Sequence, residues 1–326
     1  MATFNRSSGA RNLFFGIALA LLFFLSKSEF VFSGSPSTGL WIVNVHEHIQ
    51  SRQLVPKLLG VMNQQGILKS VLLGSPSATL HGAQEKENFE KYEENNQEIL
   101  QIAKDHPDRF IPFVTLDPRD PRKLEKFKQD LTRGAQGLKL YSGHVIFHDL
   151  PLNDPSMDSV YAFCESKKIP IMLHVNAGYY LAEFEGVLNQ YPRLKVICPH
   201  FCLSTIATDR FERLMDQHPN LYTDLSFGSL DYLMPALFRF SKEPEKYRKL
   251  ILKYQDRIFF GVDAVVTDEP HQTLEWLNDL VQVYKDVLEK QFYTTPFYPF
   301  QSLRGLSLSK DILDKIYYRN YSQFIT

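Results

Sequence analysis

Short apolar runs alternate with helix-like stretches along most of this chain, and that alternation restricts its fold more than any other feature. Eight β-rich runs occur, at residues 41–45, 70–73, 110–115, 137–140, 170–173, 195–198, 221–223 and 258–261. Most are continuously apolar, which is typical of parallel strands covered on both faces. A helix-like stretch follows each run, at residues 53–65, 88–105, 121–133, 155–167, 181–189, 205–217, 230–254 and 272–290. Eight strand–helix repeats predict an α/β fold of the (β/α)8, TIM-like barrel type, whereas a doubly wound open sheet would need fewer strands or a second domain.

Length and charge agree with one large globular domain. The chain has 326 residues, and barrels of this type routinely exceed the usual size of a single domain. With 44% hydrophobic residues it has ample material for a core, which excludes a disordered chain. Its 36 Lys and Arg nearly balance 37 Asp and Glu, so there is no electrostatic basis for nucleic-acid binding. Three cysteines are too few for a disulfide framework.

The N-terminal segment has the pattern of a targeting sequence. Arg6 and Arg11 precede an apolar run at 13–25, and polar residues follow it. This order is typical of a secretory signal peptide, and an uncleaved anchor is the alternative. We therefore expect residues 1–38 to be a signal peptide or N-terminal membrane anchor plus a short linker, and residues 39–326 to form the barrel with its C-terminal helix. The protein is expected to be exported, to the periplasm or the extracellular space, or to be membrane-anchored.

Histidines and one aspartate fall where several of the predicted strands end. His46 and His48 close the first strand as an H-x-H pair, His174 and His200 end the fifth and sixth, and Asp263 follows the eighth. The carboxyl ends of all barrel strands meet on one rim, so these five side chains are expected to converge. Imidazole and carboxylate ligands suit zinc, with iron or manganese as alternatives. The sequence therefore predicts a metal site at the barrel mouth.

Strand alternation makes two further predictions about side-chain direction. Asn44 is expected to share a face with His46 and His48. In the fourth run, Lys139 and Tyr141 should point into the barrel, because Leu138 and Leu140 face the helices. A buried lysine needs a partner, so Lys139 is expected to meet a carboxylate of the site or of the substrate.

Several motifs resemble those of the amidohydrolase superfamily, in particular the amidohydrolase-related branch that includes aminocarboxymuconate-semialdehyde decarboxylase-like enzymes. The motifs are VNVHEH at 43–48, GLKLYSG at 137–143, PIMLHVNAG at 170–178, KVICPHF at 195–201 and IFFGVDA at 258–264. The resemblance covers nearly the whole chain from Trp41 onward. It implies a metal-dependent enzyme on a TIM-like barrel.

The resemblance also implies roles for individual residues. His46, His48, His174 and Asp263 would be the ligands of one divalent metal ion, with Zn2+ favoured. His200 would position and deprotonate the attacking water, and Asp263 would help to shuttle its proton. A second metal, bridged by a carboxylated Lys139, is the alternative, while an unmodified Lys139 would bind substrate together with Tyr141.

The expected reaction is hydrolysis of a C–N or ester bond in a small molecule by a metal-activated water. Decarboxylation by the same kind of site is the first alternative. A catalytically silent binding barrel is the second, because Asn44 replaces the aspartate common before the H-x-H and the turn at 264–267 is unusually apolar. The aromatic segment at 292–300 could cover the barrel, act as a lid or pack in a homodimer.

Overall fold

A computed structural model describes residues 39–81 and 89–325. The predicted leader at 1–38 lies outside these described residues. None of the helices in the described part of the chain combines the length and apolarity needed to span a bilayer.

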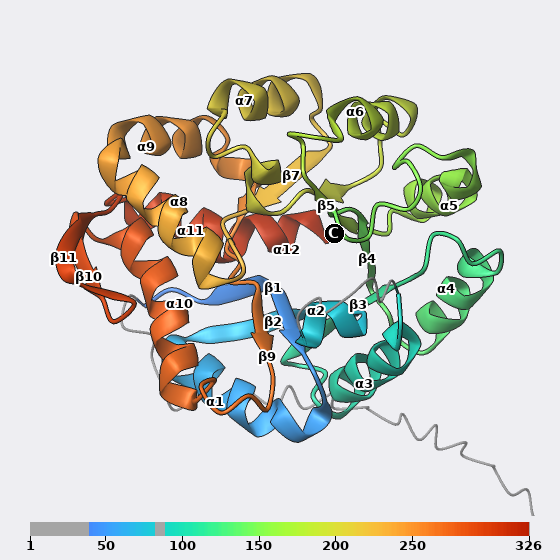
Figure 1. Ribbon diagram of the computed structural model, residues 1–326, viewed down its shortest axis with the longest axis horizontal. Helices are drawn as coiled ribbons and strands as arrows, with labels where there is room; N and C mark the ends of the chain where they lie inside the picture. Colours follow the sequence, from blue (N-terminus) through green and yellow to red (C-terminus); the bar gives the residue numbers. More distant parts are fainter. Residues whose placement is uncertain (1–38, 82–88, 326) are drawn as a thin grey trace, which may run out of the picture. The chain divides into compact units, whose positions relative to one another are not determined.

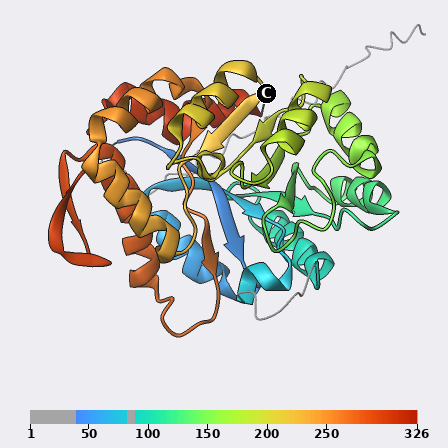
Figure 2. The same cartoon turned by 45° about the horizontal axis from the view of Figure 1, so that its top comes forward.

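A single sheet of parallel strands forms the centre of the fold (Figure 1, Figure 2). The strands lie in the order β8-β7-β6-β5-β4-β3-β2-β1-β9, so from β1 to β8 the strands adjacent in sequence are also adjacent in space. The strands are β1 (Ile42–Ile49), β2 (Ile67–Leu73), β3 (Phe110–Thr115), β4 (Gly137–Gly143), β5 (Ile171–Val175), β6 (Val196–Ile197), β7 (Leu221–Asp224), β8 (Ile258–Phe259) and β9 (Ala264–Val266). Nearly every strand residue is buried, as the continuous apolar runs predict. The TIM-like α/β prediction is confirmed.

Two short strands share the eighth position of the barrel. β8 pairs with β7, whereas β9 pairs with β1 through His48 and Val265 among others. The four residues between β8 and β9 remain attached to β1, because Val45 N donates to Phe260 O at 2.9 Å and Asp263 N donates to His46 O at 2.8 Å. The strand predicted at 258–261 is thus shorter, at Ile258–Phe259, and a strand that the sequence did not predict follows at Ala264–Val266. Asp263, between the two, lies directly against β1.

Helices cover the outer face of the sheet (Figure 1). They are α1 (Val55–Gln65), α2 (Ser77–His81), α3 (Tyr92–Asp105), α4 (Lys123–Thr132), α5 (Asp158–Lys167), α6 (Leu181–Gln190), α7 (Thr208–Gln217), α8 (Leu230–Lys242), α9 (Pro244–Lys253) and α10 (Leu274–Glu289). The stretch predicted as one helix at 230–254 is two, because Pro244 cannot continue the hydrogen bonding of α8 and instead begins α9.

The C-terminal helix closes the barrel end opposite the predicted metal site. It comprises α11 (Lys310–Asp314), a π-helical turn (Lys315–Arg319) and α12 (Asn320–Phe324). Phe324 packs against Phe259 and Tyr222, with ring centroids 5.2 and 4.6 Å away. These rings belong to the interior layer of the barrel, so α12 seals its base.

The aromatic segment after α10 forms an antiparallel hairpin, β10 (Phe292–Thr295) and β11 (Tyr298–Arg304). It packs beside α8, where the rings of Phe238 and Tyr298 lie 5.0 Å apart (Figure 1). The sequence did not predict these strands. None of the hairpin's residues lines the cavity described below, so it covers the side of the barrel.

Candidate metal centre

A cavity of about 750 Å³ opens where the barrel strands end. All seven residues singled out from the sequence line it: His46, His48, Lys139, Tyr141, His174, His200 and Asp263. The convergence predicted from strand ends is therefore present in the structure. Adjacent imidazoles are close, with ring centroids 5.3 Å apart for His46 and His48 and 5.1 Å for His46 and His200.

An irregularity in β1 positions the two histidines of the H-x-H pair. Val43 and Val45 both belong to the apolar interior of the barrel, so strict alternation would turn His46 and His48 outward. The register of β1 against β2 shifts between Asn44 and Glu47, and this bulge reverses the alternation. The prediction that Asn44 shares a face with the histidines is consequently wrong.

Asn44 instead forms hydrogen bonds behind the site, to the backbone of the segment before Asp263 and to Glu47. Its Nδ2 donates to Glu47 Oε2 at 2.5 Å, and its Oδ1 accepts from Val262 N at 3.1 Å. Burial raises the pKa of Glu47 well above its ordinary value, with Asp263 contributing in the same direction. Asn44 thus holds β1 to the segment that carries Asp263, from behind the cavity.

Asp263 is the point at which the site converges. Its Oδ1 lies 2.9 Å from His46 Nε2 and 3.1 Å from His48 Nε2, and its Oδ2 lies 3.6 Å from His200 Nε2. Asp263 has a positive φ of 57°, a strained conformation for this residue type. Gly228 makes room for its carboxylate, since a Cβ at that glycine would lie 2.8 Å from Asp263 Oδ2.

Asp224, at the end of β7, orients His46 from the other side. Its Oδ2 lies 2.7 Å from His46 Nδ1. Its Oδ1 accepts from His200 N at 3.0 Å and from the backbone and hydroxyl of Ser226 at 3.1 and 2.6 Å. Although burial alone would raise it, the pKa of Asp224 is lowered to about 2, because His46 and His200 face the carboxylate. Burial alone would lower the pKa of His46, but Asp263 and Asp224 outweigh it and raise the pKa above its ordinary value. An ionised Asp224 keeps a proton on His46 Nδ1, so in the neutral imidazole that binds a cation the Nε2 lone pair faces Asp263.

His48 and His200 are oriented by the same arrangement. Ser75 Oγ donates to Leu73 O at 2.9 Å, so it accepts from His48 Nδ1 at 2.7 Å. His200 Nδ1 lies 2.9 Å from the carbonyl oxygen of Ser226, which can only accept. In both histidines Nδ1 therefore carries the proton and Nε2 is free to bind a cation.

His200 reaches the cavity from an unusual backbone turn. The four residues His200–Leu203 have positive φ angles between 52° and 60°, a left-handed turn that costs roughly 1–2 kcal/mol for each residue of this kind. Burial of Phe201 among Phe211 and Phe240, with ring centroids 5.2 and 6.1 Å away, offsets part of this cost. Cys202 is buried in the same turn and takes no part in the histidine cluster.

His174 has an unsatisfied nitrogen. Its Nε2 is buried and has no hydrogen-bond partner among the described residues. The ring lies 5.1 Å from that of His200 and 4.7 Å from that of His144. Burial lowers the pKa of His174 well below its ordinary value, and His200 adds to the effect, so the ring is neutral. A buried, neutral imidazole nitrogen without a hydrogen-bond partner is typical of a residue that binds a metal ion.

Lys139 and Tyr141 point into the barrel as predicted. Lys139 Nζ lies 3.3 Å from His46 Nε2 and, among the described residues, within 4.0 Å of no carboxylate oxygen, so its predicted carboxylate partner within the site is absent there. Burial lowers the pKa of Lys139 to about 8. The hydroxyl of Tyr141 donates to Gly74 O at 3.0 Å, which makes this tyrosine part of the wall next to Ser75.

These donors fit a divalent cation. His46, His200 and Asp263 each offer a ligand atom, and the three atoms lie within 4.8 Å of one another. His48 adds an Nε2 beside the same carboxylate, and His174 adds its unpartnered Nε2. Imidazole nitrogens with one carboxylate suit zinc, manganese or iron. The tightest group includes His200, to which the sequence resemblance gives the role of proton acceptor.

Sequence reasoning missed Asp224, Ser75 and Ser226, the residues that orient the imidazoles. Asp224 immediately follows the seventh predicted strand, so the strand-end rule that found Asp263 could also have found it. The two serines follow strand ends as well, but serine is so common in loops that position alone does not single them out.

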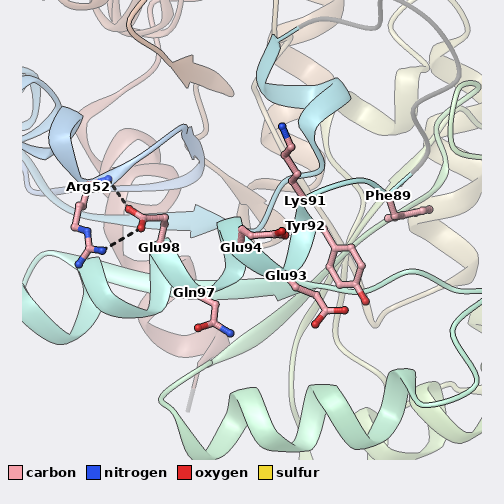
Figure 3. A pocket seen from close by; sticks show the side chains of 8 residues that line it. All are labelled: Arg52, Phe89, Lys91, Tyr92, Glu93, Glu94, Gln97 and Glu98. Carbon is pink, nitrogen blue, oxygen red and sulfur yellow. Dashed lines mark hydrogen bonds and ion pairs between the residues drawn. The ribbon is translucent and has the colours of Figure 1, made fainter.

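A second hollow, of about 720 Å³, lies along the outer side of α3 (Figure 3). Arg52 crosses it to Glu98, with Arg52 N donating to Oε2 at 2.9 Å (Figure 3). Glu93 and Glu94 are exposed there, and no histidine is among its described lining residues. This hollow is a solvated acidic face, separate in character from the barrel cavity.

Comparisons with known proteins agree with this fold. The sequence matches none of the curated proteins with which it was compared. Among solved structures it is similar to a probable 2-pyrone-4,6-dicarboxylic acid hydrolase from Acinetobacter baumannii, with 16% identity, a TM-score of 0.59, and 87% of this chain and 98% of that one covered. A 2,6-dihydroxybenzoate decarboxylase from Rhizobium gives 15% identity and a TM-score of 0.54 over 88% and 98% of the two chains. A manganese complex of 5-carboxyvanillate decarboxylase from Novosphingobium aromaticivorans gives 14% and 0.56 over 89% and 97%.

At these identities the solved structures establish the fold, and the family follows from the sequence itself. A family model described as amidohydrolase matches residues 58–320, which is most of the chain. The match includes His174, His200 and Asp263, and the H-x-H pair lies just before it. The chain belongs to the amidohydrolase family of metal-dependent enzymes.

Proposed function

We propose that this protein is a metal-dependent hydrolase that cleaves an ester or C–N bond of a small molecule in the barrel cavity. One observation carries the proposal: three imidazoles whose Nδ1 protons are fixed by Asp224, Ser75 and Ser226 turn their Nε2 atoms toward the same carboxylate, Asp263. A divalent cation held at such a site supplies a Lewis acid and lowers the pKa of water.

The roles of the ligands follow from their surroundings. His46, His48, His174 and Asp263 are proposed to hold one ion, with Zn2+ favoured by the nitrogen-rich donor set. His174 is included because its buried Nε2 has no partner in the described part of the chain. Carboxylation of Lys139 and a second ion are not needed in this proposal, because these four residues would supply enough ligands for one ion.

The remaining groups handle the proton and the developing charge. His200 Nε2, 3.6 Å from Asp263 Oδ2, accepts a proton from the attacking water while its Nδ1–H stays on the carbonyl of Ser226. Asp263 accepts a hydrogen bond from the same water. Lys139, on the floor of the cavity, donates toward the oxygen on which negative charge develops.

Metal analysis and two matched variants test the assignment. We expect close to one equivalent of divalent metal in the purified protein, loss of ester hydrolysis after chelation, and recovery with Zn2+ or Mn2+. His200→Ala should retain the metal and lose kcat by at least a hundredfold, whereas His174→Ala should lose the metal itself. Protein that is metal-free from several expression media and unaffected by added metal would contradict the proposal.

Decarboxylation is the second candidate, because Lys139 is a buried cation that could hold a substrate carboxylate beside the same donors. Release of CO2 from 2,6-dihydroxybenzoate or 5-carboxyvanillate by the metal-loaded protein would favour it. Turnover of esters without CO2 release from these acids would favour hydrolysis.

Export or anchoring of the protein is part of the proposal. Arg6, Arg11 and the apolar run at 13–25 support it. Fractionation of cells expressing the full chain should place it outside the cytosol or in the membrane fraction, and a variant that begins at Gly39 should stay in the cytosol. The same distribution for both would contradict this part.

A further inference from the structure

The walls of the barrel cavity are predominantly apolar. Side chains from several loops and from α10 form its mouth, among them Val145, Ile146, Phe227, Leu230, Val265 and Trp276. Val145 is 54% exposed and Ile146 is 40% exposed, although both are aliphatic. Val265 lies in the strand that follows Asp263, so the apolar wall begins directly next to the metal site.

Charge is confined to the floor of the cavity. Among the described residues that line it, Lys139 and Asp263 are the only members of the Asp, Glu, Lys and Arg group. Lys139 Nζ is 3.3 Å from His46 Nε2, so an anion that reaches this lysine also lies against the ligand set. The rest of the described lining offers the imidazoles of His144 and His271 and polar groups such as those of Asn176, Ser229 and Gln272.

The cavity should therefore discriminate between substrates by whether they have a charged group remote from the bond that is cleaved. A carboxylate at the metal and Lys139 is compensated, whereas a second carboxylate would lie between aliphatic and aromatic walls that have no lysine or arginine among their described residues. Burial of an unpaired charge is strongly unfavourable, while an apolar group in the same place gains from leaving water. The cavity volume leaves room for a ring or a branched chain beyond the floor.

We infer that the substrate is a neutral ester or lactone whose bulk is apolar, with no charged group beyond the bond that is cleaved. This inference rests on the proposed hydrolase function. Water adds to the acyl carbon, the acyl C–O bond breaks, and the proton taken by His200 passes to the departing oxygen. An ester then gives an acid and an alcohol, and a lactone gives a single hydroxy acid. The acid's charge stays at the floor and the alcohol leaves uncharged. An amide would release an amine that becomes a cation among walls without a carboxylate.

Matched substrates that differ in one remote charge test the inference. Dimethyl 1,4-phenylenediacetate and its monomethyl ester carry the same scissile ester, but the second has a carboxylate at the far end. With the full-length, metal-loaded protein we expect kcat/KM to be at least tenfold higher for the diester. Val145→Lys, at the mouth, should narrow this ratio severalfold, and Ile206→Lys, 77% exposed and outside the cavity lining, should leave it unchanged.

A binding measurement separates this inference from the proposed function. Methyl ketones that replace the scissile ester of each substrate cannot be hydrolysed, and their binding can be followed by the fluorescence of Trp276, which lines the cavity. Equal or tighter binding of the anionic ketone, or equal or faster turnover of the monoester, would overturn the inference. Preferential binding of the neutral ketone without hydrolysis of either ester would support the inference and overturn the hydrolase proposal.

Discussion

Replacement of Asp224 by asparagine should disable the metal site without changing its shape. The carboxylate accepts three hydrogen bonds at Oδ1, from His200 N and from the backbone and hydroxyl of Ser226. In Asp224→Asn these donors hold the amide oxygen in that place, so the NH2 group must face His46 Nδ1. An NH2 donor there moves the proton of His46 to Nε2, the atom needed to bind the ion.

The size of the effect follows from this change of tautomer. Loss of a partner that orients a metal-bound histidine weakens metal binding by about 10- to 100-fold, or roughly 1.4–2.7 kcal/mol. The wrong tautomer of His46 should place Asp224→Asn at the upper end of that range. Because Asn is isosteric with Asp, near-wild-type circular dichroism is expected, and kcat should fall even when metal is saturating.

Competition with a chromophoric chelator measures the metal affinity, and ester hydrolysis at saturating metal measures kcat. Asp209→Asn is the matched control, since Asp209 is exposed on α7 and does not line the cavity. It should bind metal as the wild type does. If Asp224→Asn bound metal with unchanged affinity and kept its kcat, the conclusion that Asp224 holds the proton of His46 on Nδ1 would be refuted.

Three further predictions follow from single contacts. Burial lowers the pKa of His48 to about 4. Between about pH 6.5 and 4 the unfolded chain therefore binds a proton at His48 that the folded chain does not. The free energy of unfolding of the metal-free protein should fall by up to about 3 kcal/mol across that range. Urea titrations across that range should show a shallower loss for His48→Gln, and an identical slope would contradict the cause given. Gly228→Ala should strain a backbone with φ of 69° and displace Asp263, which would appear as weaker metal binding with an intact fold. Thr273→Ala should lower the free energy of unfolding by about 1 kcal/mol, because the Thr273 side chain caps α10 by accepting from Trp276 N at 3.1 Å. An unchanged denaturant midpoint would show that water replaces the cap.

The strand-end rule explains why so much of the site could be predicted from sequence. Parallel strands in a barrel deliver their carboxyl ends to one rim, so residues as distant as His46 and Asp263 meet without any knowledge of side-chain packing. The rule depends only on order and periodicity, both of which are properties of the chain. It places residues on the rim, but it does not specify which ring nitrogen faces inward. That choice depends on hydrogen bonds from Ser75, Asp224 and Ser226, which lie far from their partners in sequence.

The features of the site that the sequence did not predict have a common origin in local backbone irregularity. The bulge in β1 turns Asn44 away from the face that His46 and His48 share, and no residue type in that strand requires a bulge. The left-handed turn that begins at His200 contains no glycine, so its conformation is set by tertiary contacts such as His200 N to Asp224. The break between α8 and α9, in contrast, was open to prediction, because Pro244 marks it.

Charge balance explains why these irregular segments belong to one site. His46 lies between two carboxylates, 2.7 Å from Asp224 and 2.9 Å from Asp263. The two carboxylates favour a protonated His46, which can donate to both of them. Only the neutral imidazole can bind a cation, and in that form the lone pair of His46 Nε2 faces an anion, as do those of neutral His48 and His200. Asp263 and these lone pairs repel one another unless a cation lies between them, and the single positive charge of Lys139 is too small to balance both carboxylates. A divalent ion removes the repulsion and satisfies the buried Nε2 of His174, so metal binding should stabilise the bulge, the left-handed turn and the strained Asp263 together.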